Sequence, residues 1–400
     1  MVDCISYFLG KKMSILIYIF PALFDALAAQ ALFVNSLRIA KTGAPDLVIT
    51  GLWAAWSVVY VLICFAMSRL LTERNAARCV YISCILFFLS GIGNLFGNSA
   101  VSIYLWSIMV AIACGFFFPP FQVFMKKVDR GGNKHVSYST GLYTFSWSVG
   151  FAVGPWISGF LMETGHYGWK LAFKGGAGVA VLGGILLWFF DKFILQNNNR
   201  HVNSSFLHTD GIEVEKKSLP DLAWLGWVGA TAGLMAISII RGIFPALGEK
   251  ELHLPESVQG NVFFLLSIVQ AITGLAMVSS RRWMYNPRWV GLFGFIGACG
   301  LFLFAVGKCS YSFYVAASLF GIYSGSFYFY FVFHSLIHPE KAPFYVSINE
   351  TLVGVMGFAA PLIAGGISQT TGSYGLTFLF GLVVVCIVTI FQVVIHYRLS

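Results

Sequence analysis

A single acidic residue, Asp25, interrupts the apolar stretch 14–36 and is the first candidate for chemistry in this chain. In a helix that crosses a bilayer, Asp25 would lie roughly 17 Å from the start of the stretch at about 1.5 Å per residue, near the middle of the membrane. A carboxyl group there resists ionisation and can hold a proton, so we predict that Asp25 carries protons. The alternative is a structural aspartate satisfied by neighbouring hydroxyls or helix carbonyls.

Two more ionisable residues lie inside apolar stretches. Glu350, beside Asn349 in the stretch 344–368, is predicted either to be a second proton-coupling residue or to reach the lipid headgroups. Arg241 lies about five residues from the end of the stretch 222–246, where its long side chain can extend to the membrane surface. Otherwise it is a candidate for binding an anionic part of a substrate.

An aromatic stripe gives a different kind of signal. Tyr323, Phe327, Tyr330 and His334 recur at steps of four, three and four residues and therefore share one face of a helix. Aromatic rings with hydroxyl groups suit a solute that has both a flat apolar surface and polar groups, so these residues are predicted to bind substrate. Packing against other helices or contact with lipid is the alternative, and for His334 a satisfied structural histidine.

Paired prolines mark one more candidate. Pro119 and Pro120 remove two backbone N–H donors from the stretch 100–125, so we expect a kink that exposes carbonyl groups toward protein or cavity water. Gln122 is the polar side chain best placed to use that opening and is predicted to bind substrate. The sequence has no phosphate-binding loop, metal-ligand cluster or nucleophile with a base, so it predicts neither an enzyme nor a cofactor.

The composition requires lipid rather than water as the solvent for most of these residues. Of 400 residues, 58% are apolar, 17% are aromatic and only 10% are charged, against about 25% charged in an average soluble domain. A soluble globular enzyme, a disordered chain and a collagen are therefore excluded. The eight cysteines lack the spacing of a metal or redox motif and are predicted to be small apolar side chains.

The apolar stretches predict an all-α polytopic membrane protein with twelve transmembrane helices, because a bilayer core of about 30 Å needs about 20 apolar residues per helix. A cytoplasmic N-terminus places 18 of the 25 Lys and Arg residues on the cytoplasmic side, as the positive-inside bias requires. The positive-inside bias then accounts for the net charge of +9, and nucleic acid is not a predicted partner. Both termini are expected in the cytoplasm, and the membrane is expected to be the plasma membrane, the inner membrane of a bacterium. The expected spans are 14–36, 47–67, 79–97, 100–125, 137–162, 169–190, 222–246, 258–279, 288–307, 310–335, 344–368 and 374–396.

A cleaved signal peptide is an alternative explanation of the first span, because two lysines precede an apolar run that reaches small residues at 26–28. The apolar run continues through Val34, however, and Asp25 interrupts its core. We therefore expect a retained helix.

The two halves of the sequence repeat each other. Thr-Gly-x-Tyr-Gly at 164–168 returns at 371–375, a shift of 207 positions that relates the sixth predicted helix to the twelfth. The polar segment 191–221 between the halves has no apolar period and is predicted to be a cytoplasmic linker. Two six-helix bundles are therefore expected at 1–190 and 222–400.

A glycine pattern in the fifth predicted helix resembles a motif of a known family. Small residues on one helix face allow another backbone to approach, and a proline permits a bend. The pattern consists of Gly141, Gly150, Gly154, Pro155 and Gly159. With these residues the chain resembles the major facilitator superfamily, whose fifth helix carries such a glycine-rich motif, with one departure where Ser158 replaces a glycine. Simple helix packing is the alternative explanation of the pattern.

A second motif of the family, between the second and third predicted helices, is degraded here. Glu73, Arg74 and Arg78 are present, but Ala76 stands where the family usually has glycine. In the family this cluster fastens one conformational state at the cytoplasmic face, and the resemblance predicts that role for these three charged residues. The positive-inside bias is the alternative reason for the arginines.

The resemblance implies a secondary active transporter that moves a small organic solute by alternating access. We predict proton coupling through Asp25 and Glu350, and the fifth-helix motif favours antiport or export. Proton-coupled uptake by symport is the alternative within this class, and a membrane sensor or scaffold that does not transport is the alternative of another class. The predicted partners are the solute, protons and the lipid bilayer, and the oligomeric state stays open.

Overall fold

The structure is a computed structural model of the 400-residue chain. It describes residues 16–72, 74–128, 136–192, 221–277, 283, 285–336 and 341–399. Within these ranges the chain forms twelve helices, all long and apolar enough to cross a membrane, which confirms the predicted all-α transmembrane fold. The helices are α2 (Ile19–Lys41), α3 (Asp46–Leu70), α4 (Ala76–Phe96), α5 (Ala100–Val128), α6 (Val136–Met162), α7 (Gly168–Phe190), α9 (Ala223–Lys250), α10 (Glu256–Met277), α11 (Pro287–Val306), α12 (Ser310–Leu336), α13 (Ala342–Thr371) and α14 (Tyr374–Leu399).

The ends of α2 and α9 differ most from the predicted spans. The first helix ends at Lys41 rather than near residue 36, and the seventh ends at Lys250 rather than near residue 246. Both helices lie inside the bundle, where 72% and 67% of their spanning windows are buried. Polar residues near the end of α2 find partners there: Asn35 donates to Asn94 across 3.0 Å. A helix surrounded by protein can therefore extend beyond its apolar stretch.

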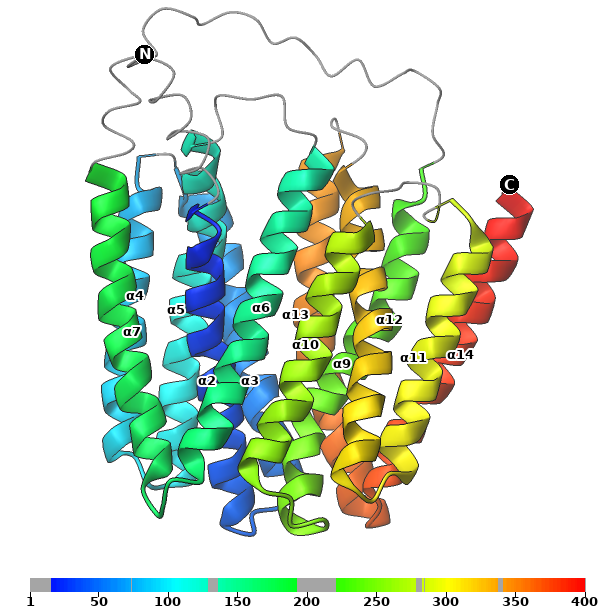
Figure 1. Cartoon of the computed structure of the whole chain (residues 1–400). Coiled ribbons are helices and arrows are strands. Elements are labelled where there is room, and N and C mark those ends of the chain that lie inside the picture. Colours follow the sequence, from blue (N-terminus) through cyan, green and yellow to red (C-terminus); the bar gives the residue numbers. More distant parts are fainter. Residues whose placement is uncertain are drawn as a thin grey trace, which may run out of the picture.

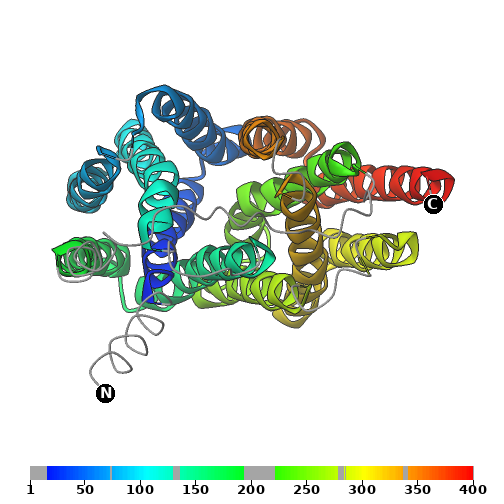
Figure 2. The ribbon, with the colours of Figure 1, turned by 90° about the horizontal axis from the view of Figure 1, so that it is seen from above.

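The helices form two groups, α2–α7 and α9–α14, which lie side by side (Figure 2). The groups contact each other mainly through α6 with α10 and α3 with α13, and also through α2 with α9, α3 with α9 and α6 with α12. The start of α2 and the end of α14 lie on the same side of the bundle (Figure 1). We call this side the terminal side and the opposite one the far side.

Small residues bring α6 into contact with its neighbours. A Cβ atom at Gly150 would lie 2.2 Å from the Ala22 carbonyl oxygen, and one at Gly154 would lie 2.2 Å from the Ala26 carbonyl oxygen, so α2 and α6 touch backbone to backbone. At Gly159 a Cβ atom would lie 2.6 Å from a carbonyl oxygen of α10. The glycines of the fifth-helix pattern thus allow α6 to touch α2 in the first group and α10 in the second.

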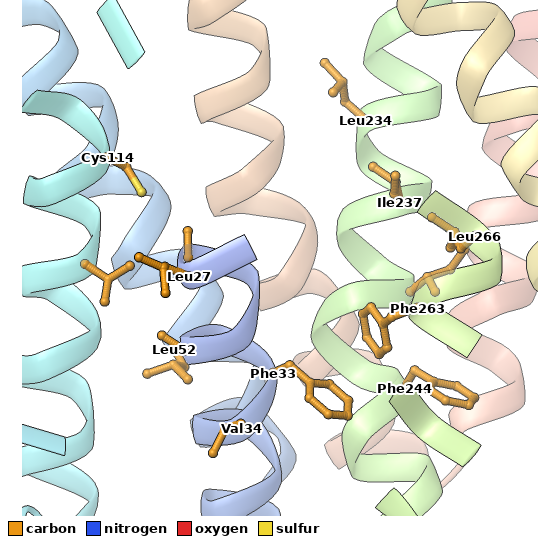
Figure 3. Packing of buried hydrophobic residues seen from close by; sticks show 14 of the residues in the cluster. Leu27, Phe33, Val34, Leu52, Cys114, Leu234, Ile237, Phe244, Phe263 and Leu266 are labelled. Carbon is orange, nitrogen blue, oxygen red and sulfur yellow. The ribbon is translucent and has the colours of Figure 1, made fainter. Parts of the chain in front are cut away.

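Aromatic rings fill the space between the groups toward the far side (Figure 3). Phe33 of α2 meets Phe263 of α10 edge-on with ring centroids 5.4 Å apart. Phe263 in turn lies 6.2 Å from Phe244 of α9. All three side chains are at most 1% exposed. This contact joins the two groups through apolar surface that water does not enter.

Candidate substrate and proton site

Asp25 lies in α2 at the contact with α6. The glycine contacts at Ala22 and Ala26 fall within one helical turn of Asp25 and fix this part of α2. The Asp25 side chain is only 8% exposed, and its Oδ2 atom has no hydrogen-bond partner among the described residues. A buried carboxyl oxygen without a partner is uncommon and marks a candidate functional group.

Asp25 lies closer to the start of its helix than the sequence predicted. It precedes Lys41, the last residue of α2, by 16 residues, which is roughly 24 Å along the axis at 1.5 Å per residue. It is therefore nearer the terminal side than the far side, and the aromatic contact around Phe33 separates it from the far side.

Arg241 of α9 is buried between the two groups. Its guanidinium lies on the ring of Phe151 from α6, with Cζ 3.7 Å from the ring centroid. The residue is 8% exposed and lies nine residues before the end of α9, so its side chain does not extend to the membrane surface. A hydrogen bond joins it to Tyr328 of α12. Its Nε and Nη2 atoms have no hydrogen-bond partner among the described residues.

Asp25 and Arg241 form an electrostatic pair that spans the two groups. Their charges act on each other, although no contact within 4.0 Å joins these two described side chains. The other titratable neighbours whose charge interacts with Asp25 are Cys114 of α5, Tyr143 of α6 and Tyr328. Charges interact more strongly in a low-dielectric interior than in water, so a change in the charge of one partner affects the other.

Aromatic side chains surround the guanidinium of Arg241. Trp147 of α6 meets Tyr328 edge-on with centroids 5.2 Å apart, and Trp53 of α3 lies 6.2 Å from Phe151. Trp56 packs against the same cluster and its buried Nε1 donor has no partner among the described residues. The region therefore offers flat apolar surface together with unused hydrogen-bond donors, which is the character of a small-molecule site.

Glu350 and Gln122 lie in a second polar group next to this one. Gln122 donates to the hydroxyl oxygen of Tyr143 across 3.2 Å, and α5 continues through both prolines as one helix. Glu350 of α13 is exposed, yet its charge acts on Tyr60 and Cys64 of α3 and on Tyr143. Glu350 therefore lies near the neighbouring helices of the first group. Its role in proton coupling stays a prediction.

The aromatic stripe of α12 faces a different space. Tyr323, Phe327 and Tyr330 line a small cavity inside the second group, together with residues of α9, α11 and α14. His334 is fully buried and packs on Tyr330, with centroids 4.5 Å apart, and on Tyr285. The structure thus brings these four residues together but does not gather them around Asp25. Their predicted role in substrate binding is untested.

The remaining residues of the two family motifs lie apart from this site. Gly141 is buried in α6, and the Ser158 hydroxyl donates to the Gly154 carbonyl across 2.7 Å. Arg74 and Arg78 are exposed at the start of α4. Glu73 lies outside the described residues, so the structure does not describe the predicted cluster of charges.

A network of polar contacts, which the sequence did not predict, holds the two groups together at the far side. Asp46, the first residue of α3, is paired with Lys250 of α9 across 2.7 Å. It also accepts hydrogen bonds from Ser368 across 2.5 Å and from Tyr374 across 3.0 Å. We call these four residues the Asp46 latch. Asp46 lies 204 to 328 positions before its three partners in the sequence, so no local pattern reveals them.

Two further contacts strengthen the far side. Lys41 forms an ion pair with Glu256, and the backbone N–H of Ser257 donates to Glu163 across 2.8 Å. On the terminal side, the described ion pair stays within the second group, where Asp221 contacts Lys341 across 3.0 Å. In the described parts of the chain, the ion pairs between the groups all lie at the far side, which is closed in this conformation.

Tyr328 was not predicted from the sequence either, although its type and position could have suggested it. It lies one residue beyond Phe327 and therefore on a different part of the α12 surface from the aromatic stripe. The helical period of the stripe points to the face of α12 that has more aromatic residues. Tyr328 lies on another part of the helix surface, where it contacts Arg241. Only the packing of α12 against α6 and α9 decides between the two faces.

Two groups of six helices with a buried polar site between them define a class of protein, the secondary transporters whose halves move about a central site. Residues 12–361 match the model of the Major Facilitator Superfamily. The chain therefore belongs to this superfamily and is an integral, multi-pass membrane protein, and the family indicates a transporter.

Solved structures share the fold. A bacterial homologue of the human lysosomal transporter Spinster, in an inward-facing and unoccupied conformation, matches with a TM-score of 0.70 and 13% identity over 97% of both chains. The same kind of homologue in an inward-facing and occupied conformation matches with a TM-score of 0.65 and 14% identity, also over 97% of both chains. At such identity the likeness shows the fold alone. No curated protein sequence matches the chain.

Proposed function

We propose that this chain moves a small organic solute by alternating access and that Asp25 couples this movement to protons. One observation carries the proposal: Asp25 of the first group and Arg241 of the second are both buried, act on each other as charges and keep unused hydrogen-bonding atoms. A group that is merely structural would have its polar atoms satisfied. A proton on Asp25 or an anion at Arg241 would change the attraction between the two halves.

The closed far side supports alternating access. The Asp46 latch and the aromatic contact around Phe33 close that side, and both structural neighbours are described as inward-facing. We therefore take the terminal side as the cytoplasmic side and the present conformation as inward-facing. In this proposal the latch opens when the site turns toward the outside. The domain limits 1–190 and 222–400, with the linker 191–221, are proposed as the two moving halves and their connection.

Two observations point to different directions of coupling. The glycine pattern of α6 favours antiport or export by its resemblance to the family motif. The pairing of Asp25 with Arg241 instead favours symport if the solute competes with Asp25 for the arginine. Reconstituted vesicles distinguish the two forms, because protons move against the solute in antiport and with it in symport.

The experiment uses the full chain in proteoliposomes that contain an internal pH-sensitive dye. We expect some small organic solutes to drive proton movement and to show counterflow of labelled solute. The Asp25→Asn variant should keep counterflow and lose solute-driven proton movement. The control is Asp191→Asn, because its carbonyl oxygen can still accept the 3.1 Å hydrogen bond from Tyr81. Absence of counterflow for every solute would favour a sensor or scaffold and contradict the proposal.

A further inference from the structure

We propose that the solute carries a carboxylate, that this carboxylate binds the unpaired edge of Arg241, and that one proton on Asp25 travels with it. This inference rests on the proposed transport function and names the class of substrate: a monocarboxylate with an aromatic or flat apolar body. It also selects symport of anion and proton over antiport.

The unpaired edge of Arg241 has the donor geometry that a carboxylate requires. Nε and Nη2, the two nitrogens without a partner among the described residues, lie on the same edge of the planar guanidinium. Parallel N–H groups on one such edge match the two oxygens of a carboxylate, which is the strongest and most specific contact that arginine makes. Tyr328 occupies the remaining side of the guanidinium through its hydrogen bond.

The charge of Arg241 also requires an anion. A guanidinium that is 8% exposed, with its face on Phe151, has lost most of its water. The phenol of Tyr328 accepts one hydrogen bond but brings no opposite charge near neutral pH. A buried charge in this situation is costly unless an anion compensates it. Among the described residues, the acid whose charge acts on Arg241 is Asp25.

Asp25 and a bound carboxylate therefore compete for one positive charge. With Asp25 ionised, the pair is neutral and a second anion near Arg241 meets repulsion. With Asp25 protonated, Arg241 is free to bind the carboxylate of the solute. The other groups that face Asp25 are the thiol of Cys114 and the phenols of Tyr143 and Tyr328, which are neutral near pH 7. Anion binding and proton binding are thus linked, with about one proton for each negative charge of the solute.

The surroundings of Arg241 indicate the rest of the solute. Phe151, Trp147 and Tyr328 provide flat apolar surfaces, and the Nε1 atom of Trp56 is a buried donor without a partner among the described residues. An aromatic or flat ring fits such surfaces, and an additional acceptor atom on the ring would satisfy Trp56. Three donors without a partner among the described residues, the Nε and Nη2 atoms of Arg241 and Nε1 of Trp56, favour a solute with acceptor atoms.

The test compares each acid with its own amide. The purified full chain in detergent is titrated with phenylacetate, 3-phenylpropionate and indole-3-acetate, and with phenylacetamide, 3-phenylpropionamide and indole-3-acetamide, by thermal stabilisation. We expect stabilisation by at least one carboxylate and at least tenfold weaker binding of its amide. At a pH at which Asp25 is ionised in the free chain, binding of the acid in weakly buffered solution should take up about one proton per chain. Asp25→Asn should abolish this uptake while the anion still binds.

Two variants of Arg241 separate the roles of charge and shape. Arg241→Gln should weaken binding of the anion about 100-fold, and Arg241→Lys, which keeps the charge but loses the paired donors, about tenfold. If Arg241→Gln does not fold, Arg241→Lys and the comparison of each acid with its amide still test whether Arg241 binds a carboxylate. Equal binding of acids and amides, or no binding of any acid, overturns the inference. Proton-coupled counterflow of a neutral or cationic solute overturns it too, but leaves the proposed transport function intact.

Discussion

Among the described residues, two aspartates are buried between the halves, and they differ in how their oxygens are used. Asp46 is 9% exposed and Asp25 is 8% exposed. The carboxylate of Asp46 is paired with Lys250 and accepts hydrogen bonds from Ser368 and Tyr374, whereas Oδ2 of Asp25 has no partner among the described residues. Equal burial therefore does not imply an equal role. The satisfied aspartate holds the two halves together, and the unsatisfied one is available to a proton or to a change of charge on Arg241.

The largest expected effect comes from removing the cation that pairs with Asp46. Lys250→Met leaves that aspartate buried without its cation, which should favour opening of the far side by about 2 kcal/mol, or roughly thirty-fold. Spin labels at Thr42 and Thr370, exposed at the far side of the two groups, should report longer distances between the labels after the native cysteines are replaced. Lys308→Met, an exposed lysine on the same side, is the control. Unchanged distances in Lys250→Met would show that the latch does not hold this side closed.

The next largest effect concerns the helix that carries Asp25. Gly154→Ala places a methyl group 2.2 Å from the Ala26 carbonyl oxygen, against backbone that has no room to yield. We expect a loss of about 1–3 kcal/mol in stability and reduced transport, since α2 must shift relative to α6. The matched control is Gly178→Ala in α7, where a Cβ atom meets nothing within 4 Å. Thermal unfolding of both variants decides, and equal melting temperatures would contradict the assigned helix contact.

A smaller effect is expected at a more exposed ion pair, and it tests how much burial contributes to closure of the far side. Lys41 also joins the two halves, through Glu256, but its side chain is 41% exposed against 24% for Lys250. Lys41→Met should therefore favour far-side opening by less than about 1 kcal/mol, because water screens an exposed pair. The same spin-label distances measure it. An effect as large as that of Lys250→Met would mean that the number of ion pairs, and not their burial, sets the stability of the closed side.

The smallest effect is expected in the cavity of the second group. The buried hydroxyl of Tyr330 has no hydrogen-bond partner among the described residues, so Tyr330→Phe should change stability by no more than about 0.5 kcal/mol. Tyr311→Phe, at an exposed position of the same helix, serves as the control. A large loss of transport at unchanged stability would instead support the sequence prediction that the aromatic stripe binds substrate.

Hydropathy predicted the number of helices because each must match the thickness of a bilayer, whatever its neighbours are. It misplaced the ends of α2 and α9, which protein surrounds and which can therefore carry polar residues such as Asn35 and Arg38. It also selected Asp25 and Arg241, because a charge in an apolar stretch is costly wherever it points. Their pairing was not predicted, since it depends on how α2 and α9 face each other.

Other features of the site depend on packing that one sequence does not contain. The aromatic stripe of α12 has a correct helical period, yet period alone does not tell which neighbour the stripe faces. The Asp46 latch joins residues from α3, α9, α13 and α14. In the sequence, Asp46 follows Pro45 at the start of a span and has the ordinary character of a helix start.

Transport by matched variants of the two buried aspartates tests whether Asp25 couples transport to protons. Accumulation driven by a pH gradient and counterflow without a gradient are measured in the same proteoliposomes for the wild type, Asp25→Asn and Asp46→Asn. We predict that Asp25→Asn keeps counterflow but loses accumulation, and that Asp46→Asn changes the rate of both while accumulation stays coupled to protons. Accumulation by Asp25→Asn at the wild-type level, or uncoupling by Asp46→Asn, would contradict the assignment of proton coupling to Asp25.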